Sequence, residues 1–117
     1  MTELLHITER VNWVEAAMTG EYRMSTRGTT LAEQGFIHCS LRHQLRPVAE
    51  FLYDDADVDE LVVLVIDSER VPATVRYEAP EPGGEQYPHI YGVLPAIAVT
   101  EVVAVSRDAA GRLVLPS

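Results

Sequence analysis

The sequence predicts one small domain of the α+β class, with two main helices packed against β-strands. A continuous apolar run, Leu61–Ile66, is rich in β-branched residues and too short to cross a membrane. We therefore expect it to form a fully buried strand at the centre of the sheet. The first helix is indicated by four apolar residues at helical spacing, Val11, Val14, Ala17 and Met18.

The first helix should follow a short strand over Glu3–Ile7. Thr8 is expected as its N-cap, because a threonine hydroxyl can accept a free amide hydrogen at a helix start. Glu9 suits the positive end of the helix dipole, and Gly20 can end the helix in the left-handed conformation. Trp13 lies beside the apolar stripe, and we interpret it as a packing residue.

The second helix is expected over residues 41–53, with Ser40 as its cap. Pro47 would break this helix unless the true start lies there, with the proline in the first turn. Its expected apolar face is formed by Leu45, Val48, Phe51 and Leu52. The other expected elements are a helical turn over 31–34, an alternating strand over 74–78, a loop over 79–92 and a terminal hairpin of 101–106 with 112–115.

Composition limits the possible classes of protein. A chain of 117 residues with 47% hydrophobic and 23% charged residues fits a single folded domain spanning 1–117, neither disordered nor membrane-spanning. One cysteine and the absence of a basic leader segment indicate the cytoplasm. A net charge of -9 opposes general nucleic-acid binding, although a local basic pocket for a small phosphate stays open. The oligomeric state is left undetermined.

The stretch Gln34–Ser40 combines a strand pattern with a histidine and the only cysteine. Alternation along the strand places Phe36, His38 and Ser40 on one face, and Ile37 and Cys39 on the other. Because both faces are partly apolar, the strand should be covered on each side. His38 is then either a hydrogen-bonded core histidine or a cleft residue.

Other candidate residues lie in less regular segments. Arg23 and Arg27, on an expected loop of an acidic protein, are the best candidates for a local anion site, although each could be a solvated charge. The segment Tyr87–Gly92 is dense in aromatic and imidazole groups and could cover the core or form a ligand wall. His43 is expected to be exposed. The acidic run 54–60 lacks the glycine and spacing of a calcium loop.

Three segments together resemble the bacterial family catalogued as domain of unknown function 952: His6–Thr8, Gly35–Ser40 and Tyr87–Gly92. The resemblance runs from Leu5 to about Ser106 and leaves 107–117 for the last strand of the C-terminal hairpin. It implies a small α+β fold with a split mixed β-sheet, related to the ADP-ribosyltransferases. In that superfamily the sheet holds NAD or ADP-ribose in a cleft.

The resemblance also implies roles for particular residues. His6 is similar to the strand histidine that binds the adenosine ribose in ADP-ribosyltransferases, and the late acid is Glu78 or Glu85. His6–Thr8 and Phe36–Ser40 also look similar to motifs of the RNA 2'-phosphotransferases, although Leu5 and Ile7 replace the arginine and glycine of the first motif. The catalytic candidates are His6, His38 and Glu85. The ligand-binding candidates are Thr8, Arg23, Arg27, Phe36, Ser40, Tyr87, His89 and Tyr91.

Three hypotheses follow. The first is an enzyme or binding domain for NAD, ADP-ribose or a related small nucleotide, with no cofactor firmly indicated. The second is a metal-dependent enzyme using His6, His38 and His89, but no pair of these has a standard ligand spacing, so we expect no metal. The third is a nucleophilic Cys39, for which a buried inert thiol is the alternative. We expect the three histidines to meet in one cleft that excludes His43.

Overall fold

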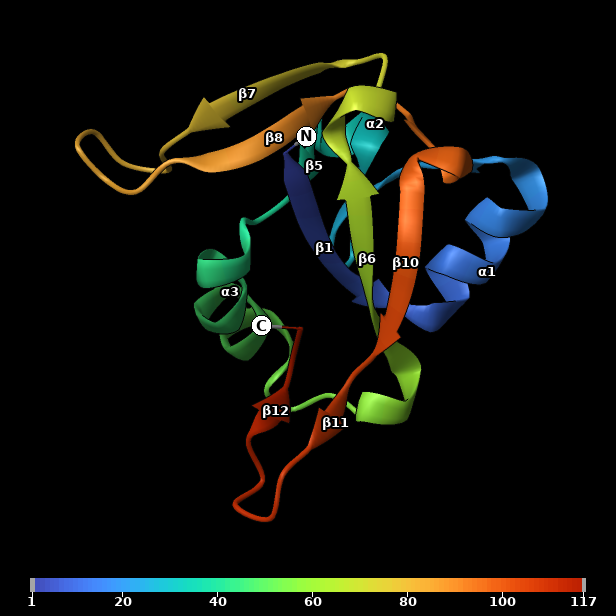
Figure 1. Ribbon diagram of the computed structural model, residues 1–117. Helices are drawn as coiled ribbons and strands as arrows, with labels where there is room; N and C mark the ends of the chain where they lie inside the picture. The colour runs from blue at the N-terminus through green and yellow to red at the C-terminus, as the bar shows by residue number, and fades with distance from the viewer. Residues whose placement is uncertain (1, 117) are drawn as a thin grey trace.

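A computed structural model describes residues 2–116, and at its centre is a three-stranded antiparallel sheet (Figure 1). The strands have the order β1 (Glu3–Glu9), β6 (Leu61–Asp67) and β10 (Val99–Ala104). Every residue of β6 is buried, because apolar side chains cover both faces of the sheet. The predicted central strand is confirmed and extends one residue further, to Asp67.

Two helices cover opposite faces of this sheet, α1 (Arg10–Thr19) and α3 (Leu45–Tyr53) (Figure 1). Side chains of β1 alternate between the two apolar clusters, with Leu4 in the cluster under α1 and Leu5 in the cluster under α3. The two main helices expected from the sequence are therefore present. A third helix, α2 (Leu31–Gln34), is the single turn expected before Gly35.

The start and the buried face of α1 differ from the sequence prediction. Strand β1 continues through Glu9, which is the N-cap residue, so Thr8 does not cap the helix. Only Ala16 of α1 is buried, and Trp13 packs partly buried against the same cluster. The predicted stripe instead faces solvent, with Met18 83% exposed.

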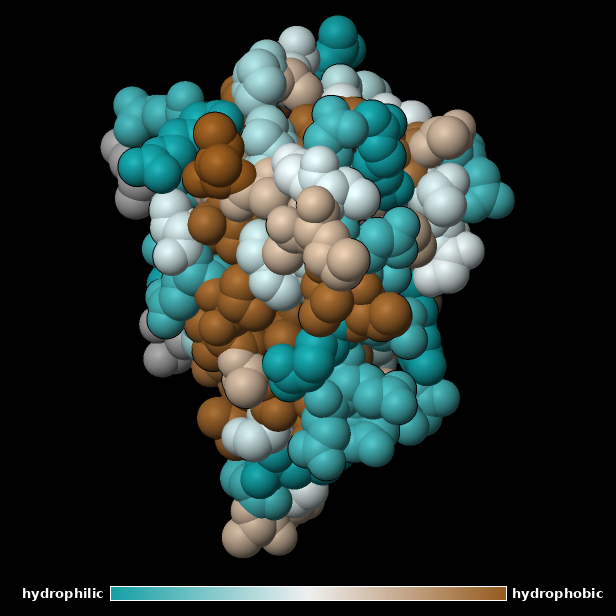
Figure 2. Space-filling model, turned by 90° about the vertical axis from the view of Figure 1, so that its right-hand side faces the viewer, coloured by the Kyte–Doolittle hydropathy of each residue, from teal (hydrophilic) through white to brown (hydrophobic). Residues whose placement is uncertain are grey.

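Ala16 and the partly buried Trp13 are thus the residues of α1 that pack against this cluster. Gly20 ends α1 with φ of 88°, as predicted. Figure 2, which views the side that carries α1 in Figure 1, shows hydrophobic residues gathered at the centre of this face.

Helix α3 begins at Leu45, after a short 3-10 turn, Arg42–Gln44, so the predicted start at 41 with Ser40 as cap is wrong. Pro47 lies in its first turn, which is the alternative that the sequence allowed. Its buried side is Leu45, Ala49 and Tyr53, spaced by four residues each. Val48 and Leu52 are half-buried, whereas Phe51 is 87% exposed and was wrongly assigned to the buried face. The buried side is thus a single row of residues four apart, narrower than the predicted face.

A second three-stranded sheet has the order β5 (Ile37–His38), β8 (Tyr87–Tyr91) and β7 (Thr74–Glu78). The strand at 74–78 is confirmed, but residues 87–91 form the middle strand of this sheet and not the expected loop. Proline and glycine density indicated a loop there. Pro88 has no amide hydrogen to donate, but its carbonyl accepts a hydrogen bond from the Cys39 amide, at 3.0 Å.

The two sheets join at Leu5 and Ser40, whose amides and carbonyls exchange two hydrogen bonds of 2.8 Å. The segment after β5 thus continues, through Ser40, onto the edge of β1. Ile37 and Cys39 are buried and Phe36 and His38 are half-buried, so the predicted alternation of faces is confirmed. Within residues 2–116 every strand pair is antiparallel, and the β-structure is split between the two sheets.

The remaining strands form short pairs: β2 (Glu21–Tyr22) with β9 (Leu94–Pro95), β3 (Met24–Thr26) with β4 (Thr29–Thr30), and β11 (Ser106–Arg107) with β12 (Leu113–Val114). Further 3-10 turns lie at Val58–Glu60, Ser68–Arg70 and Ala96–Ala98. The expected C-terminal hairpin is β11 with β12, while 101–104 belongs to β10. The chain is a small α+β protein, and none of its helices within 2–116 is long and apolar enough to cross a membrane.

Candidate functional site

A cavity of about 780 Å³ lies between β1, the second sheet and α3. This volume is within the usual range of small-molecule sites. Its walls contain residues from all three: Leu5, His6, Ile7, Thr26, Gln34, Phe36, His38, Cys39, Ser40, Pro47, Val48, Phe51, Leu52, Glu78, Ala79, Pro80, Tyr87, His89 and Tyr91. Three of the four histidines border it, as expected, and His43 does not.

The strand register explains why these side chains face one way. His38 pairs with His89, and His89 in turn pairs with Arg76 across the second sheet. Directly paired residues and residues two positions away share a face of a sheet. Glu78, Tyr87 and Tyr91 therefore lie on the same face as the two histidines, and this face lines the cavity.

Four rings pack together on this wall. Phe36 stacks on His89 with ring centroids 4.2 Å apart, and contacts His38 edge-on at 4.7 Å. His38 and His89 are themselves edge-to-face at 5.0 Å, and Tyr91 lies 5.2 Å from Phe36. Such contacts stabilise the rings by about 0.5–1.5 kcal/mol per pair beyond their burial. The wall is thus fixed before any ligand arrives.

Glu78 holds His89 in one orientation. Its Oε1 lies 2.9 Å from His89 Nδ1 and also accepts a hydrogen bond from the Tyr91 hydroxyl. These bonds lower the pKa of Glu78, with the Tyr91 bond the larger cause, so the group is a carboxylate that can only accept. His89 Nδ1 must therefore carry the hydrogen.

His38 is the more open of the two imidazoles. It is half-buried, and its ring nitrogens make no hydrogen bond within residues 2–116. Burial, and then the neighbouring His89, lower the pKa of His38. The ring therefore presents one N–H donor and one acceptor to the cavity at neutral pH.

His6, predicted as a catalytic residue, borders the cavity, but its ring nitrogens are bonded within the protein. Only 3% of it is exposed, and both ring nitrogens are occupied: Nδ1 by the His38 carbonyl at 2.6 Å and Nε2 by the Tyr22 hydroxyl at 2.6 Å. A carbonyl only accepts, so His6 Nδ1 donates. The side chain supports the backbone of His38 from beneath the cavity wall.

Thr8, predicted to bind a ligand, belongs to the same buried network and is not among the residues that line the cavity. Burial lowers the pKa of His6 to about 4, so its Nε2 is unprotonated and accepts from the Tyr22 hydroxyl. Thr8 Oγ1 lies 2.8 Å from the Tyr22 oxygen and accepts from Asn12 Nδ2 at 3.1 Å. All four hydrogen bonds of this network then run in one direction. Asn12 donates to Thr8, Thr8 to Tyr22, Tyr22 to His6, and His6 to the His38 carbonyl.

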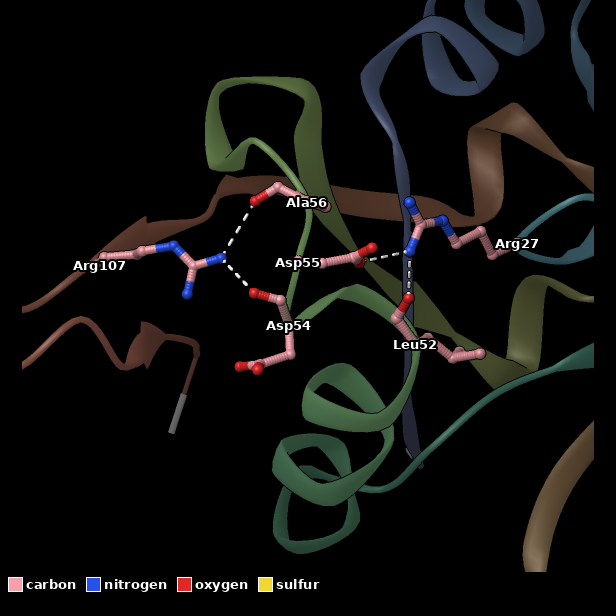
Figure 3. A network of polar contacts seen from close by, with 6 residues as sticks. All are labelled: Arg27, Leu52, Asp54, Asp55, Ala56 and Arg107. Atoms are coloured by element: carbon pink, nitrogen blue, oxygen red, sulfur yellow. Dashed lines mark hydrogen bonds and ion pairs between the residues drawn. The ribbon is translucent and has the colours of Figure 1, made fainter.

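The predicted arginines do not form an anion site at the cavity. Arg23 pairs with Glu21 at 2.7 Å, and neither arginine is among the lining residues. Arg27 donates to the Leu52 carbonyl at 2.5 Å and to Asp55 at 3.0 Å (Figure 3). Figure 3 also shows Arg107 donating to the carbonyls of the same acidic loop.

Arg27 and Arg107 therefore hold the acidic run to the rest of the chain, because each arginine donates to at least one acceptor within that run and to one outside it. No Lys or Arg within 2–116 lines the cavity.

The acid at the cavity is Glu78 and not Glu85. Glu85 accepts from Gln44 Nε2 at 2.8 Å and lies 3.6 Å from the exposed His43, outside the cavity. The loop between β7 and β8 carries it past the sheet edge, whereas Glu78 is the last residue of β7. Ser40 and Tyr87 do line the cavity, as their predicted roles require.

Two other predicted chemistries can be compared with the geometry. Cys39 is buried, and burial raises the pKa of its thiol, so the sulfur stays protonated and inert. Within residues 2–116 no three His, Cys, Asp or Glu side chains are arranged to hold a metal ion. The sequence did not predict that Tyr22 supports the site or that α3 lines the cavity, because no local pattern indicates either role. The α3 wall consists of Pro47, Val48, Phe51 and Leu52.

Comparison with known proteins supports the family resemblance. A family model described as "Protein of unknown function (DUF952)" matches residues 7–102. The crystal structure of protein CC0527 from Caulobacter crescentus is similar, with 28% identity, a TM-score of 0.79 and coverage of 96% of this chain and 93% of that one. Its solution NMR structure gives 29% identity, a TM-score of 0.73 and coverage of 96% and 91%. No curated protein matches.

Proposed function

Because the chain belongs to the DUF952 family, whose description assigns no function, we propose from the cavity itself that the protein binds a small nucleotide-like ligand. The observation that carries this proposal is the wall of Phe36, His38, His89 and Tyr91 on one face of the second sheet. Packed rings suit a planar base or nicotinamide, and imidazoles suit ribose hydroxyls. NAD and ADP-ribose are the candidate ligands.

The nucleotide class, and a relationship of the fold to ADP-ribosyltransferases, come from the resemblance of the motifs. The position of the cavity, between two antiparallel sheets, is consistent with a split sheet that holds its ligand in the gap. A cytoplasmic location belongs to the same proposal, since a single buried cysteine needs no oxidising compartment.

The charges that line the cavity indicate which part of a nucleotide lies inside it. Its titratable lining is His6, His38, Cys39, Glu78, Tyr87, His89 and Tyr91, with no Lys or Arg. A diphosphate inside would lack the cationic partner that buried charge requires. Arg76, on β7 and 5.3 Å over the Tyr91 ring, is a cation beside this wall. We therefore place the ring and ribose inside and the phosphates at the mouth. The net charge of -9 is unfavourable for polymeric RNA or DNA.

A thermal-shift titration tests the proposal with NAD, ADP-ribose, nicotinamide, adenosine and divalent metals. A ligand at a hundred times its dissociation constant stabilises the fold by about 2.7 kcal/mol, which is a measurable rise in melting temperature. The His38→Ala variant should lose the shift, because its ring contributes both a contact and a hydrogen bond. Loss of the shift without a lower melting temperature of the free protein would support the site.

His43→Ala is the matched control, because His43 lies outside the cavity and is 72% exposed. It should retain the full shift. Nicotinamide released from NAD would show processing as well as binding. A shift produced by metals alone would favour the metal-dependent alternative, and no shift with any nucleotide would refute the proposed ligand class.

A further inference from the structure

We propose that His89 is a general base that activates water for attack on a carbonyl carbon, with Glu78 as its positioning residue. This reaction rests on the proposed function in one respect, that the cavity admits a small molecule. The substrate class is an uncharged carboxylic ester with an apolar or aromatic group.

The geometry at His89 supplies the first argument. The Glu78 carboxylate accepts a hydrogen bond from His89 Nδ1–H, with 2.9 Å between the nitrogen and oxygen atoms, so the neutral imidazole carries its lone pair on Nε2. His89 Nε2 makes no hydrogen bond within residues 2–116, although His89 is 92% buried and lines the cavity. An imidazole oriented by a carboxylate, with its second nitrogen unoccupied in a cavity, is the arrangement that general-base catalysis requires.

The rigidity of the ring supplies the second argument. Phe36 stacks on His89 at 4.2 Å, and Glu78 is itself fixed by the Tyr91 hydroxyl. The imidazole is thus held on one face and at one nitrogen, and the remaining nitrogen has little freedom. Preorganisation of this kind removes the reorganisation that a mobile histidine would need during proton transfer.

His38 supplies the donor that such a reaction needs. Its ring centroid lies 5.0 Å from that of His89, and its neutral form has one N–H with no partner in the described chain. Attack on a carbonyl places negative charge on the carbonyl oxygen, which a nearby N–H can stabilise. Among residues 2–116 no Lys or Arg lines the cavity, and Arg76, which shares the face of His89, lies over the Tyr91 ring, 5.3 Å from its centroid. Phosphoryl transfer needs several cationic groups around the phosphate and is therefore less suitable.

The step balances with water as the co-reactant. His89 Nε2 removes a proton from water while the water oxygen bonds to the carbonyl carbon, and His38 donates a hydrogen bond to the resulting oxyanion. Collapse of this intermediate breaks the bond between the carbon and the alcohol oxygen. The His89 imidazolium returns its proton to the leaving alcohol, which regenerates the imidazole and leaves a carboxylic acid.

Two measurements on the full chain test the proposal. Long-range ¹⁵N–¹H NMR correlations report the tautomer of each histidine, and His89 should be protonated at Nδ1 with Nε2 bare. Hydrolysis of p-nitrophenyl butyrate should depend on His89 and Glu78, with kcat reduced about 100-fold in His89→Gln and in Glu78→Gln. Glu78→Asp should restore part of kcat at unchanged KM, because it keeps the carboxylate.

Controls separate the possible outcomes. His43→Ala should hydrolyse the ester at the wild-type rate, which would show that the exposed His43 imidazole is not the source of the activity. If His89→Gln does not fold, Glu78→Gln still decides, since the Glu78 side chain is 37% exposed. A His89 protonated at Nε2, or equal ester hydrolysis in all variants, would overturn the proposal. Hydrolysis that depends on His89, with no change in melting temperature on adding any nucleotide, would refute the proposed ligand but still support His89 as the general base.

Discussion

Removal of one hydroxyl, by Tyr22→Phe, should destabilise the fold through the buried network beneath the cavity. Tyr22 is 1% exposed, and its hydroxyl lies 2.6 Å from His6 Nε2 and 2.8 Å from Thr8 Oγ1. Phenylalanine keeps the ring but leaves the His6 nitrogen without a donor. A buried polar group left unsatisfied costs about 1–3 kcal/mol, so we expect a loss of about 2 kcal/mol.

Urea unfolding measures this change, and the midpoint should fall without a change in slope. Thermal unfolding should show a drop of about 8 °C, from roughly 4 °C per kcal/mol for a domain of this size. The matched control is Tyr53→Phe, since Tyr53 is equally buried but its hydroxyl makes no hydrogen bond within the described residues. Equal effects of the two substitutions, or a Tyr22→Phe effect below about 0.5 kcal/mol, would refute the network as described.

Two of the buried titratable groups, His6 and Cys39, and Phe51 of α3 give further tests. The pKa of His6 is lowered from 6.5 to about 4 in the folded protein. As the pH falls, His6 is therefore protonated in the unfolded state before it is protonated in the folded state. Up to about 3 kcal/mol of folding stability should be lost between pH 6.5 and pH 4. His6→Gln should flatten that part of the stability curve measured by urea unfolding, and an unchanged slope would contradict the assignment. Cys39 should react with a disulfide reagent only at the rate of unfolding, because the native thiol is buried and protonated; rapid modification in native buffer would show otherwise. Phe51→Ser should change the melting temperature little but weaken ligand binding several-fold, since Phe51 is exposed beside the cavity; strong destabilisation would place it in the core.

Local signals in the sequence were sufficient for much of the framework. The β-branched run at Leu61–Ile66 and the glycine at Gly20 each specify their structure through neighbours in the chain, and both predictions are confirmed. Strand alternation likewise placed Phe36 and His38 together on one face. Each of these features is determined by residues that are close together in the sequence, so a short segment is enough to predict it.

Features set by distant contacts could not be predicted in this way. The Thr8 hydroxyl bonds to Tyr22, 14 residues away, and not to a helix amide. The choice of Glu78 over Glu85 depends on the register between β7 and β8, which no short segment reveals. A helix with two partly apolar sides can bury either of them, and in α1 the Trp13 side is the one that packs against the core.

A titration of the ¹⁵N-labelled protein with NAD, ADP-ribose and adenosine, followed by amide NMR shifts, decides whether the cavity binds a nucleotide-like molecule. If the cavity binds the ring and ribose, saturable shifts should concentrate at Phe36, His38, His89 and Tyr91, all of which line it. His43 and the exposed side of α1 should be unaffected. Shifts confined to those outer surfaces, or a spectrum unchanged at millimolar concentrations of all three ligands, would contradict the claim that this cavity recognises a nucleotide-like molecule.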